Sequence, residues 1–184
     1  MRIGVDVEAG LAFQVALPDE DDLLQALIVS ARMTIEAYIR RFCITQSWRL
    51  RFDAWPRSMR DADPFISLPL SPFQSVGAVR VFDSSGAAIL LPSTSYAARP
   101  TPDCARISFA SAPPTPGIPR DGIEIDIAVG YGDNAQDVPE PLRRAMTMLT
   151  TRWYENRGDG DAGDMRLPQQ VIALATPFRR DRLI

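Results

Sequence analysis

One segment near the end of the chain, residues 137–157, has a start, a buried face and an end that can all be read from its amino acids. Pro139 and Pro141 suit the first turn of a helix, where a missing backbone N–H has no partner inside the helix. Apolar residues then recur at spacings of three and four until Gly158 ends the pattern. They are Leu142, Ala145, Met146, Leu149 and Trp153. The segment predicts an amphipathic helix over residues 139–157, with one buried face.

A second helical pattern lies near the start of the chain, over residues 19–42. Asp19 is a candidate N-cap, and the acidic residues that follow it, including Asp22, suit the positive end of the helix dipole. Apolar residues then keep helical spacing for about five turns. We expect this stripe to be core that packs against the helix at 139–157, and the same holds for Met33 and Tyr38 at its edges. The stripe consists of Leu24, Leu27, Ile28, Ala31, Ile35, Tyr38, Ile39 and Phe42.

Between the two helices the apolar period changes from 3.6 to 2, which is typical of strands. The clearest strand is 123–129, where isoleucine and valine alternate with Glu124 and Asp126. The proline-rich segment 111–119 is too rigid for regular structure and predicts a surface loop. The other predicted strands are 44–53, an edge strand within 65–72, and two hairpins, 76–82 with 87–91 and 95–99 with 105–109.

Strands joined by turns form antiparallel sheets, and the helices are segregated from them, so the predicted class is α+β. We expect a small bundle of two long helices and one short helix, the short one over residues 168–175. An antiparallel β subdomain at 44–130 is inserted between the long helices. The predicted organisation is an extended lead at 1–18, one domain at 19–176, and an extended tail at 177–184 with no place in the domain's own core.

The composition excludes most kinds of catalytic site. The 184 residues contain no histidine, which removes every nucleophile that depends on a Ser–His or Cys–His pair. The two cysteines, Cys43 and Cys104, lack metal-ligand spacing and are too few for a disulfide framework, so we expect two reduced, packed thiols. No apolar run is long enough for a bilayer and no export signal is visible, so we expect a soluble intracellular protein with no membrane association.

Acidic pairs are the remaining candidates for enzyme chemistry, because two carboxylates can share acid and base roles or hold a metal. Asp61 and Asp63 lie in a charged loop without a matching second cluster. Asp159 and Asp161 have the spacing of a calcium loop, but Gln170 stands where that loop needs a glutamate. We therefore expect no catalytic residue, no metal and no cofactor, and keep a small metal-dependent hydrolase at residues 159–164 as an alternative.

Charge is placed unevenly along a chain whose net charge is −3. Every basic residue is an arginine, whose planar group suits contacts with several acceptors at protein interfaces. The first segment is rich in acidic residues. Near the end of the chain, Asp181 is the one acidic residue among Arg179, Arg180 and Arg182. The acidic N-terminal segment of one copy either contacts the basic C-terminal tail of another copy, or both segments remain solvated.

Five segments, in order, resemble the head-tail connector family of tailed phages, members of which also occur in gene transfer agents. The layout of helix, sheet and helix from about residue 19 to residue 180 is similar as well. The turn at 158–164 is longer and richer in glycine than we expect for the family. The five segments are residues 44–50, 68–76, 129–133, 138–142 and 153–157.

The resemblance implies a structural adaptor and not an enzyme. Such a protein forms a ring of about twelve copies beneath the portal protein of a phage or phage-like particle. It carries the stopper and tail proteins below, and DNA passes through its channel without sequence-specific binding. The expected location is the particle neck, after assembly in the bacterial cytoplasm. Another head-tail component, such as a stopper, is an alternative.

The resemblance also implies two groups of site residues. The tail is expected to reach into the portal, where an extended segment can add a strand to a partner's sheet. Neighbouring subunits are expected to meet at Asp19, Asp22, Arg143, Arg144 and Arg152. The portal-binding tail comprises Phe178, Arg179, Arg180, Arg182, Leu183 and Ile184.

Overall fold

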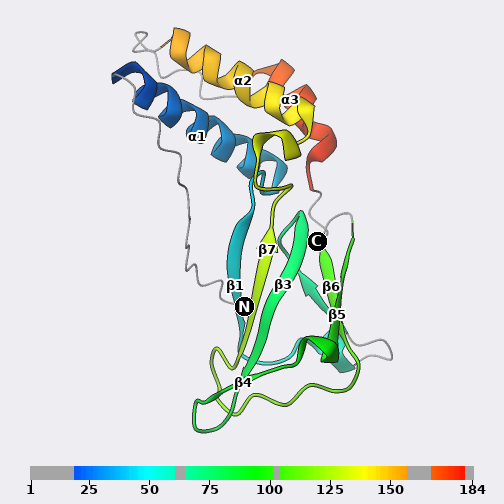
Figure 1. The fold of residues 1–184 in the computed structure, drawn as a ribbon. Helices are drawn as coiled ribbons and strands as arrows, with labels where there is room; N and C mark the ends of the chain where they lie inside the picture. The colour runs from blue at the N-terminus through cyan, green and yellow to red at the C-terminus, as the bar shows by residue number, and fades with distance from the viewer. Residues whose placement is uncertain (1–18, 61–64, 102–103, 157–166, 181–184) are drawn as a thin grey trace. The chain divides into compact units, whose positions relative to one another are not determined.

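The computed structural model describes residues 19–60, 65–101, 104–156 and 167–180 (Figure 1). The fold is α+β, as predicted, and the described residues contain three α-helices and two antiparallel sheets. They divide into a helical unit, built from residues 19–44 and 131–180, and a β unit, built from residues 45–130. No helix in these ranges is both long and apolar enough to cross a membrane.

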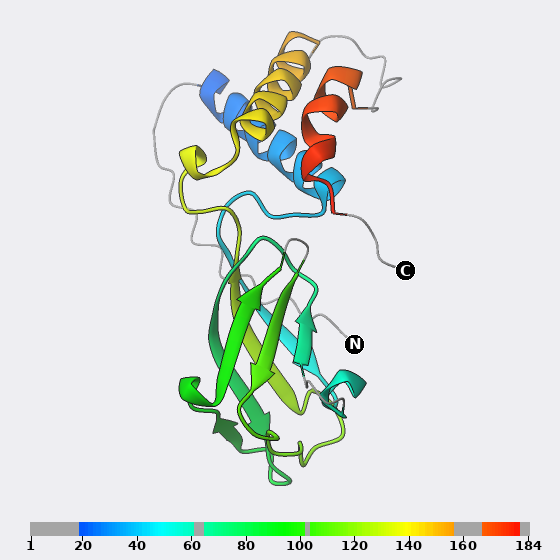
Figure 2. The ribbon, with the colours of Figure 1, turned by 90° about the vertical axis from the view of Figure 1, so that its right-hand side faces the viewer.

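The helical unit contains α1 (Asp19–Ile39), α2 (Glu140–Glu155) and α3 (Gln169–Ala175), which lie against one another in Figure 2. Pro139 is the N-cap of α2, and Pro141 lies in its first turn, as the sequence predicts. Its end differs from the prediction: the side chain of Asn156 caps the helix by donating to the carbonyl of Arg152 at 2.7 Å. Similarly, α1 ends three residues early, because Arg40 adopts a left-handed φ of 57°.

One hydrophobic core holds the three helices together. The α1 side of this core consists of Ala31, Ile35 and Ile39. The α2 side consists of Leu142, Ala145 and Leu149. From α3 come Val171 and Ala175. Trp153 and Met146 of the predicted α2 face are only partly buried, although they pack against the same core.

The predicted α1 stripe is core only in its second half. Leu24 and Ile28 are 38% and 49% exposed, and Met33, which we expected in the core, is the most exposed of them at 59%. Met33 is exposed because, at 100° per residue, it lies on the side of α1 opposite the buried Ala31, Ile35 and Ile39. Leu24 and Ile28 are exposed because of length: at 1.5 Å per residue the 21 residues of α1 span about 31 Å and the 16 residues of α2 only about 24 Å. The first turns of α1 therefore extend beyond the helix that covers the rest of it.

The β unit contains two antiparallel sheets, which are stacked one in front of the other in Figure 2. The four-stranded sheet has the order β1 (Gln46–Phe52), β7 (Ile123–Val129), β3 (Phe73–Phe82), β4 (Ala88–Leu90). The three-stranded sheet has the order β2 (Phe65–Leu68), β6 (Ala105–Phe109), β5 (Tyr96–Pro100). Both predicted hairpins and the edge position of β2 are confirmed.

Strand β7 lies inside the larger sheet, and its alternating residues form the core of the β unit. Ile123, Ile125, Ile127 and Val129 are at most 2% exposed. The predicted loop at residues 111–119 has no helix or strand and is held to the end of β3, where Gly117 N–H donates to the carbonyl of Phe82 at 2.8 Å. Residues 57–60, which precede the charged segment that contains Asp61 and Asp63, form a short 3-10 helix.

The chain leaves the helical unit for the β unit and returns to it at neighbouring points. Ile44, which precedes β1, forms a bridge with Gly132, which follows β7. Beside this bridge, Tyr131 N–H donates to the carbonyl of Cys43 at 3.1 Å. The outgoing and returning segments are thus hydrogen-bonded to each other at the boundary of the helical unit.

Candidate functional site

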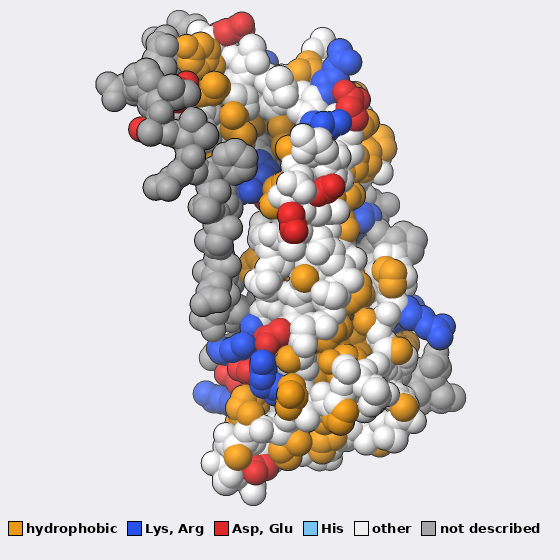
Figure 3. Space-filling model, viewed as in Figure 1, with side chains coloured by type: hydrophobic (Ala, Val, Ile, Leu, Met, Phe, Trp, Pro, Cys, Tyr) orange, Lys and Arg blue, Asp and Glu red, His pale blue; other side chains and the backbone are white. Residues whose placement is uncertain are grey.

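Five charged side chains that are joined by ion pairs lie on the outward face of the larger sheet. Because side chains alternate along a strand, the burial of the β7 isoleucines turns Glu124 and Asp126 to the opposite face. The strand register then sets Arg49 opposite Asp126 and Arg51 opposite Glu124 on β1, while β3 supplies Arg80. Figure 3 shows arginine and carboxylate side chains mixed on this part of the surface.

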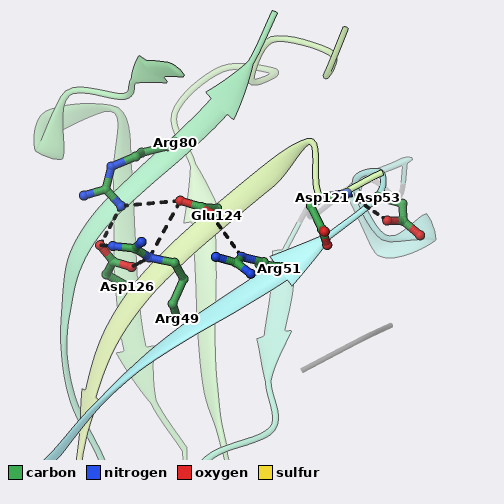
Figure 4. Close-up of polar contacts among 7 residues, drawn as sticks. All are labelled: Arg49, Arg51, Asp53, Arg80, Asp121, Glu124 and Asp126. Carbon is green, nitrogen blue, oxygen red and sulfur yellow. Dashed lines mark hydrogen bonds and ion pairs between the residues drawn. The ribbon is translucent and has the colours of Figure 1, made fainter. Parts of the chain in front are cut away.

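The five side chains form one network of ion pairs (Figure 4). Asp126 accepts from Arg49 Nε at 2.7 Å and from Arg80 Nη1 at 2.6 Å, using a different oxygen for each. Glu124 accepts from Arg51 Nε at 3.1 Å. Its other oxygen is 3.7 Å from Arg49 Nε and 4.0 Å from Arg80 Nη1. The network ties three adjacent strands together across their outward face.

The ion pairs of this network are suited to stabilising the sheet. Partial burial acts to raise the pKa of the Asp126 carboxyl, but the hydrogen bonds and charges of Arg49 and Arg80 outweigh it and hold the pKa below its usual range. A carboxylate with a lowered pKa stays ionised at neutral pH, so it is poorly suited to act as a general acid or base there. The paired arginines are likewise already engaged with carboxylates, which weakens the case for a phosphate site.

The lowered pKa of Asp126 predicts a pH dependence of stability. Its contribution is fully present above the pKa of the unfolded chain, about 4, and is lost as the pH falls through the lower folded-state value. We expect Asp126→Asn to be less stable than the unmodified protein at pH 7, and this difference to shrink as the pH is lowered from 5 towards 2. Denaturant unfolding across this range measures it, with the exposed Asp133→Asn as control. A difference independent of pH would contradict the assignment.

Cys43 lies in the helical core, as expected for a packed thiol. Burial, together with the nearby Glu36 carboxylate, raises its pKa to about 12. The same carboxylate accepts from the backbone N–H of Cys43 at 2.7 Å. Burial raises the pKa of Glu36 as well, although this bond opposes the rise. A thiol with so high a pKa is protonated at neutral pH and a poor nucleophile.

The start of the predicted tail lies on the helical unit, contrary to our expectation that the tail has no place in the domain's core. Phe178 packs against the helical core, and its carbonyl accepts from Arg41 Nε at 2.8 Å. The guanidinium of Arg179 lies 5.1 Å from the ring centre of Tyr38. Arg180 N–H donates to the carbonyl of Ile39, the last residue of α1, at 2.9 Å. Residues 178–180 are therefore attached to the end of α1, whereas Arg182, Leu183 and Ile184 lie outside the described residues.

The residues expected between subunits have different environments. The side chains of Asp22 and Arg144 are exposed, on α1 and α2 respectively. Those of Arg143 and Arg152 are half-buried. Asp19 begins α1, but its side chain is not among those described. The ion pairs of the larger sheet involve none of these residues.

The exposed apolar surface of α1 is a feature that sequence reasoning missed. Leu23, Val29 and Met33 are 40%, 37% and 59% exposed, on the side of the helix away from the core. The signal was present in the sequence, since residues 23–31 contain no charged residue and so lack a polar face. The first half of α1 is apolar on several sides and not on one face only.

The acidic candidates for metal or acid–base chemistry, Asp61, Asp63, Asp159 and Asp161, fall outside the described residues. Within the described ranges, no three or more acidic, cysteine or histidine side chains gather closely enough to hold a metal ion.

Three solved structures are similar to this chain over most of its length. A chain from the virion of a native gene transfer agent particle has a TM-score of 0.73 and 28% sequence identity, covering 95% of this chain and 86% of that one. A chain from the neck of an empty particle, computed with C6 symmetry, has a TM-score of 0.71 and 29% identity, covering 94% and 86%. A chain from the neck of the native particle, computed with C12 symmetry, has a TM-score of 0.70 and 28% identity, covering 88% and 84%.

No family model matches the sequence, and no curated protein matches it. The structural matches nevertheless extend over nearly the whole chain, and 28–29% sequence identity accompanies the shared fold. The resemblance inferred from the sequence is confirmed at the level of proteins from a gene transfer agent neck. The matches do not distinguish an adaptor from a stopper.

Proposed function

We propose that this protein is a structural adaptor in the neck of a gene transfer agent or related phage-like particle. It forms a ring beneath the portal, links the capsid to the stopper and tail, and leaves a channel for DNA. The observation that carries this proposal is the similarity over 95% of the chain to a protein of a native gene transfer agent virion. Because helical and β units align together, the likeness reaches beyond one common substructure.

A ring of about twelve copies is compatible with the two matching necks, one of which was computed with C12 and the other with C6 symmetry. A contact between two different surfaces of the same protein, repeated by rotation, closes into such a ring. The net charge of −3 suits a channel through which DNA must slide, because strong phosphate binding would retard it. The arginines of the larger sheet support this as well, since carboxylates already neutralise part of their charge.

We assign portal binding to the tail, residues 178–184, in which two parts have different roles. Residues 178–180 anchor the tail to the end of α1. The residues beyond them, Arg182, Leu183 and Ile184, are then the ones that contact the portal. An extended segment can pair with the edge of a partner's sheet through its backbone hydrogen bonds.

The test uses the full-length protein, a variant lacking residues 181–184, and the portal protein of the same organism. We expect the full-length protein to bind the portal and to be present in purified particles. The truncated variant should have the same melting temperature but lose portal binding, because the anchor at 178–180 is kept.

Three results would count against parts of this proposal. If the full-length protein neither binds the portal nor occurs in particles, the adaptor assignment is wrong. If it occurs in particles but contacts only other neck proteins, it is a stopper or another neck component. If the truncated variant still binds the portal, the contact lies elsewhere on the molecule.

A further inference from the structure

Strand β1 is the outermost strand on one side of the larger sheet, within the described part of the chain. It runs for seven residues, none of which is proline. The other strands at sheet edges are shorter, with three residues in β4, four in β2 and five in β5. Pro100 also ends β5, and Pro69 follows β2. Because short length and proline limit the pairing of an edge, β1 is the edge best suited to accept a further strand.

The backbone groups of alternate β1 residues point away from β7. Two hydrogen bonds at the ends of β7 show that its even-numbered residues bond towards β3, and its odd-numbered residues therefore bond towards β1. The two bonds run from Gly130 N–H to the Pro72 carbonyl at 2.8 Å and from Phe82 N–H to the Gly122 carbonyl at 2.9 Å. The register pairs odd residues of β7 with even residues of β1. The N–H and C=O groups on the outer side of β1 are those of Ser47, Arg49 and Arg51.

Residues 2–8, which lie outside the described residues, have the alternation of a strand and match the two faces of β1. The apolar members of the segment are Ile3, Val5 and Val7, and between them lie Gly4 and Asp6. Strand β1 likewise has Trp48 and Phe52 on the same side as the buried Leu50, and Arg49 and Arg51 on the outward face (Figure 4). One antiparallel register brings apolar residues of the segment beside apolar residues of β1.

The charges of the segment fit the outward face of the sheet. The ion-pair network there has three arginines and two carboxylates, so its arginines are in excess. In the register that sets Val5 opposite Leu50, Asp6 lies opposite Arg49 and supplies a further carboxylate. The same register sets Arg2 opposite the carboxylate of Asp53 and Glu8 opposite Ser47. Opposite charges placed directly across two strands stabilise their pairing.

The chain between residue 8 and α1 is long enough for this pairing within one copy. At 1.5 Å per residue, the helix from Asp19 to Glu36 spans about 26 Å. The Glu36 carboxylate holds the backbone N–H of Cys43 at 2.7 Å, three residues before β1 begins. The ten residues 9–18 reach about 33–36 Å when extended, which covers this span. A segment that arrives at the start of β1 in this way runs antiparallel to it.

We infer that residues 2–8 form a fifth strand of the larger sheet, antiparallel to β1 of the same copy. The occupant of the edge is thus the chain's own N-terminal segment, chosen by its alternation, its charges and its reach. The strand covers the longest edge in the described part of the molecule, so separate copies do not pair with one another there. The inference is independent of the proposed function, because it concerns the isolated protein.

Amide hydrogen exchange measured by NMR tests the pairing, with the full-length protein and a variant lacking residues 2–8. We expect the outer N–H groups of Arg49 and Arg51 to exchange slowly in the full-length protein and about tenfold faster or more in the variant. The N–H groups of Trp48 and Leu50 bond to β7 and should stay slow in both, which shows that the sheet remains folded. Equal rates for Arg49 and Arg51 in the two proteins would overturn the inference.

A disulfide across the proposed pair gives a second test in the intact chain. In a Cys104→Ser background that keeps the buried Cys43, Glu8→Cys with the exposed Ser47→Cys places two thiols opposite each other. Directly opposite residues of antiparallel strands are close enough for a disulfide, so mild oxidation should link residues 8 and 47 within a monomer.

Val15→Cys with Ser47→Cys is the matched control for this disulfide. Residue 15 is four residues from Asp19 and reaches only about 13–14 Å from the start of α1, so no link to residue 47 is expected. Disulfide-linked dimers of the Glu8→Cys, Ser47→Cys variant would show that the strand comes from another copy, and this overturns the inference. Two free thiols after oxidation, or equal linkage in the control, would overturn it as well.

Discussion

Ile35→Ala is expected to lower the free energy of unfolding of the helical unit by about 2–5 kcal/mol. The side chain is fully buried at 0% exposure, in the core that all three helices share. Truncation removes buried apolar surface and leaves a cavity among three packed helices, and such a site collapses only in part. Denaturant unfolding followed by circular dichroism at 222 nm measures the change, because the signal there comes mainly from helices.

Met33→Ala on the same helix is the matched control. It lies two residues earlier but is 59% exposed, so its effect should stay within about 0.5 kcal/mol. The pair separates packing from helix propensity, since each variant places alanine in α1. Equal losses of stability for both variants would mean that the exposed and buried sides of α1 have been assigned wrongly.

Gly117→Ala is expected to destabilise the β unit by about 1–3 kcal/mol through overpacking. A Cβ atom there would lie 2.5 Å from the carbonyl carbon of Asp83 and would also collide with the backbone of Ser84, at the β3–β4 turn. Backbone atoms cannot move aside as a flexible side chain can. The substitution should therefore push the loop at 111–119 away from the turn and weaken the Gly117–Phe82 hydrogen bond.

Trp55 provides a local probe of this displacement. Its indole N–H donates to the carbonyl of Pro114, in the same loop, at 2.7 Å. The Trp55 indole resonance should shift in Gly117→Ala, while Gly77→Ala, whose added Cβ would lie at an ordinary 3.6 Å from Asp126 Cβ, should leave it in place. An unchanged resonance and unchanged stability for Gly117→Ala would refute the close approach.

The order and type of the main elements could be predicted because they depend on local patterns. The alternation at 123–129 is enough to identify a strand and to show that Glu124 and Asp126 point away from its buried side. The prolines at 139 and 141 likewise mark the start of α2. Each of these signals acts within a few residues, where the sequence holds all the information needed.

The contacts of the charged network and of the tail could not be predicted in the same way. The partner of Asp126 on β3 depends on two register shifts in the β3–β7 pairing, between Phe73 and Ser75 and between Val76 and Ala78. The anchoring of Arg180 depends on the carbonyl of Ile39, which is far away in the sequence. The exposure of Leu24 and Ile28 depends on where the covering helices end. All three are set by tertiary packing.

The bridge between Ile44 and Gly132 affects how the sequence of such a protein can evolve. Because the outgoing and returning segments are bonded to each other where they leave the helical unit, the ends of the insertion stay adjacent whatever lies between them. Loops or whole strands can then be gained or lost in the β unit without altering the distance that α1 and α2 must span. The helical unit can conserve one geometry while the inserted residues diversify to meet different neighbours.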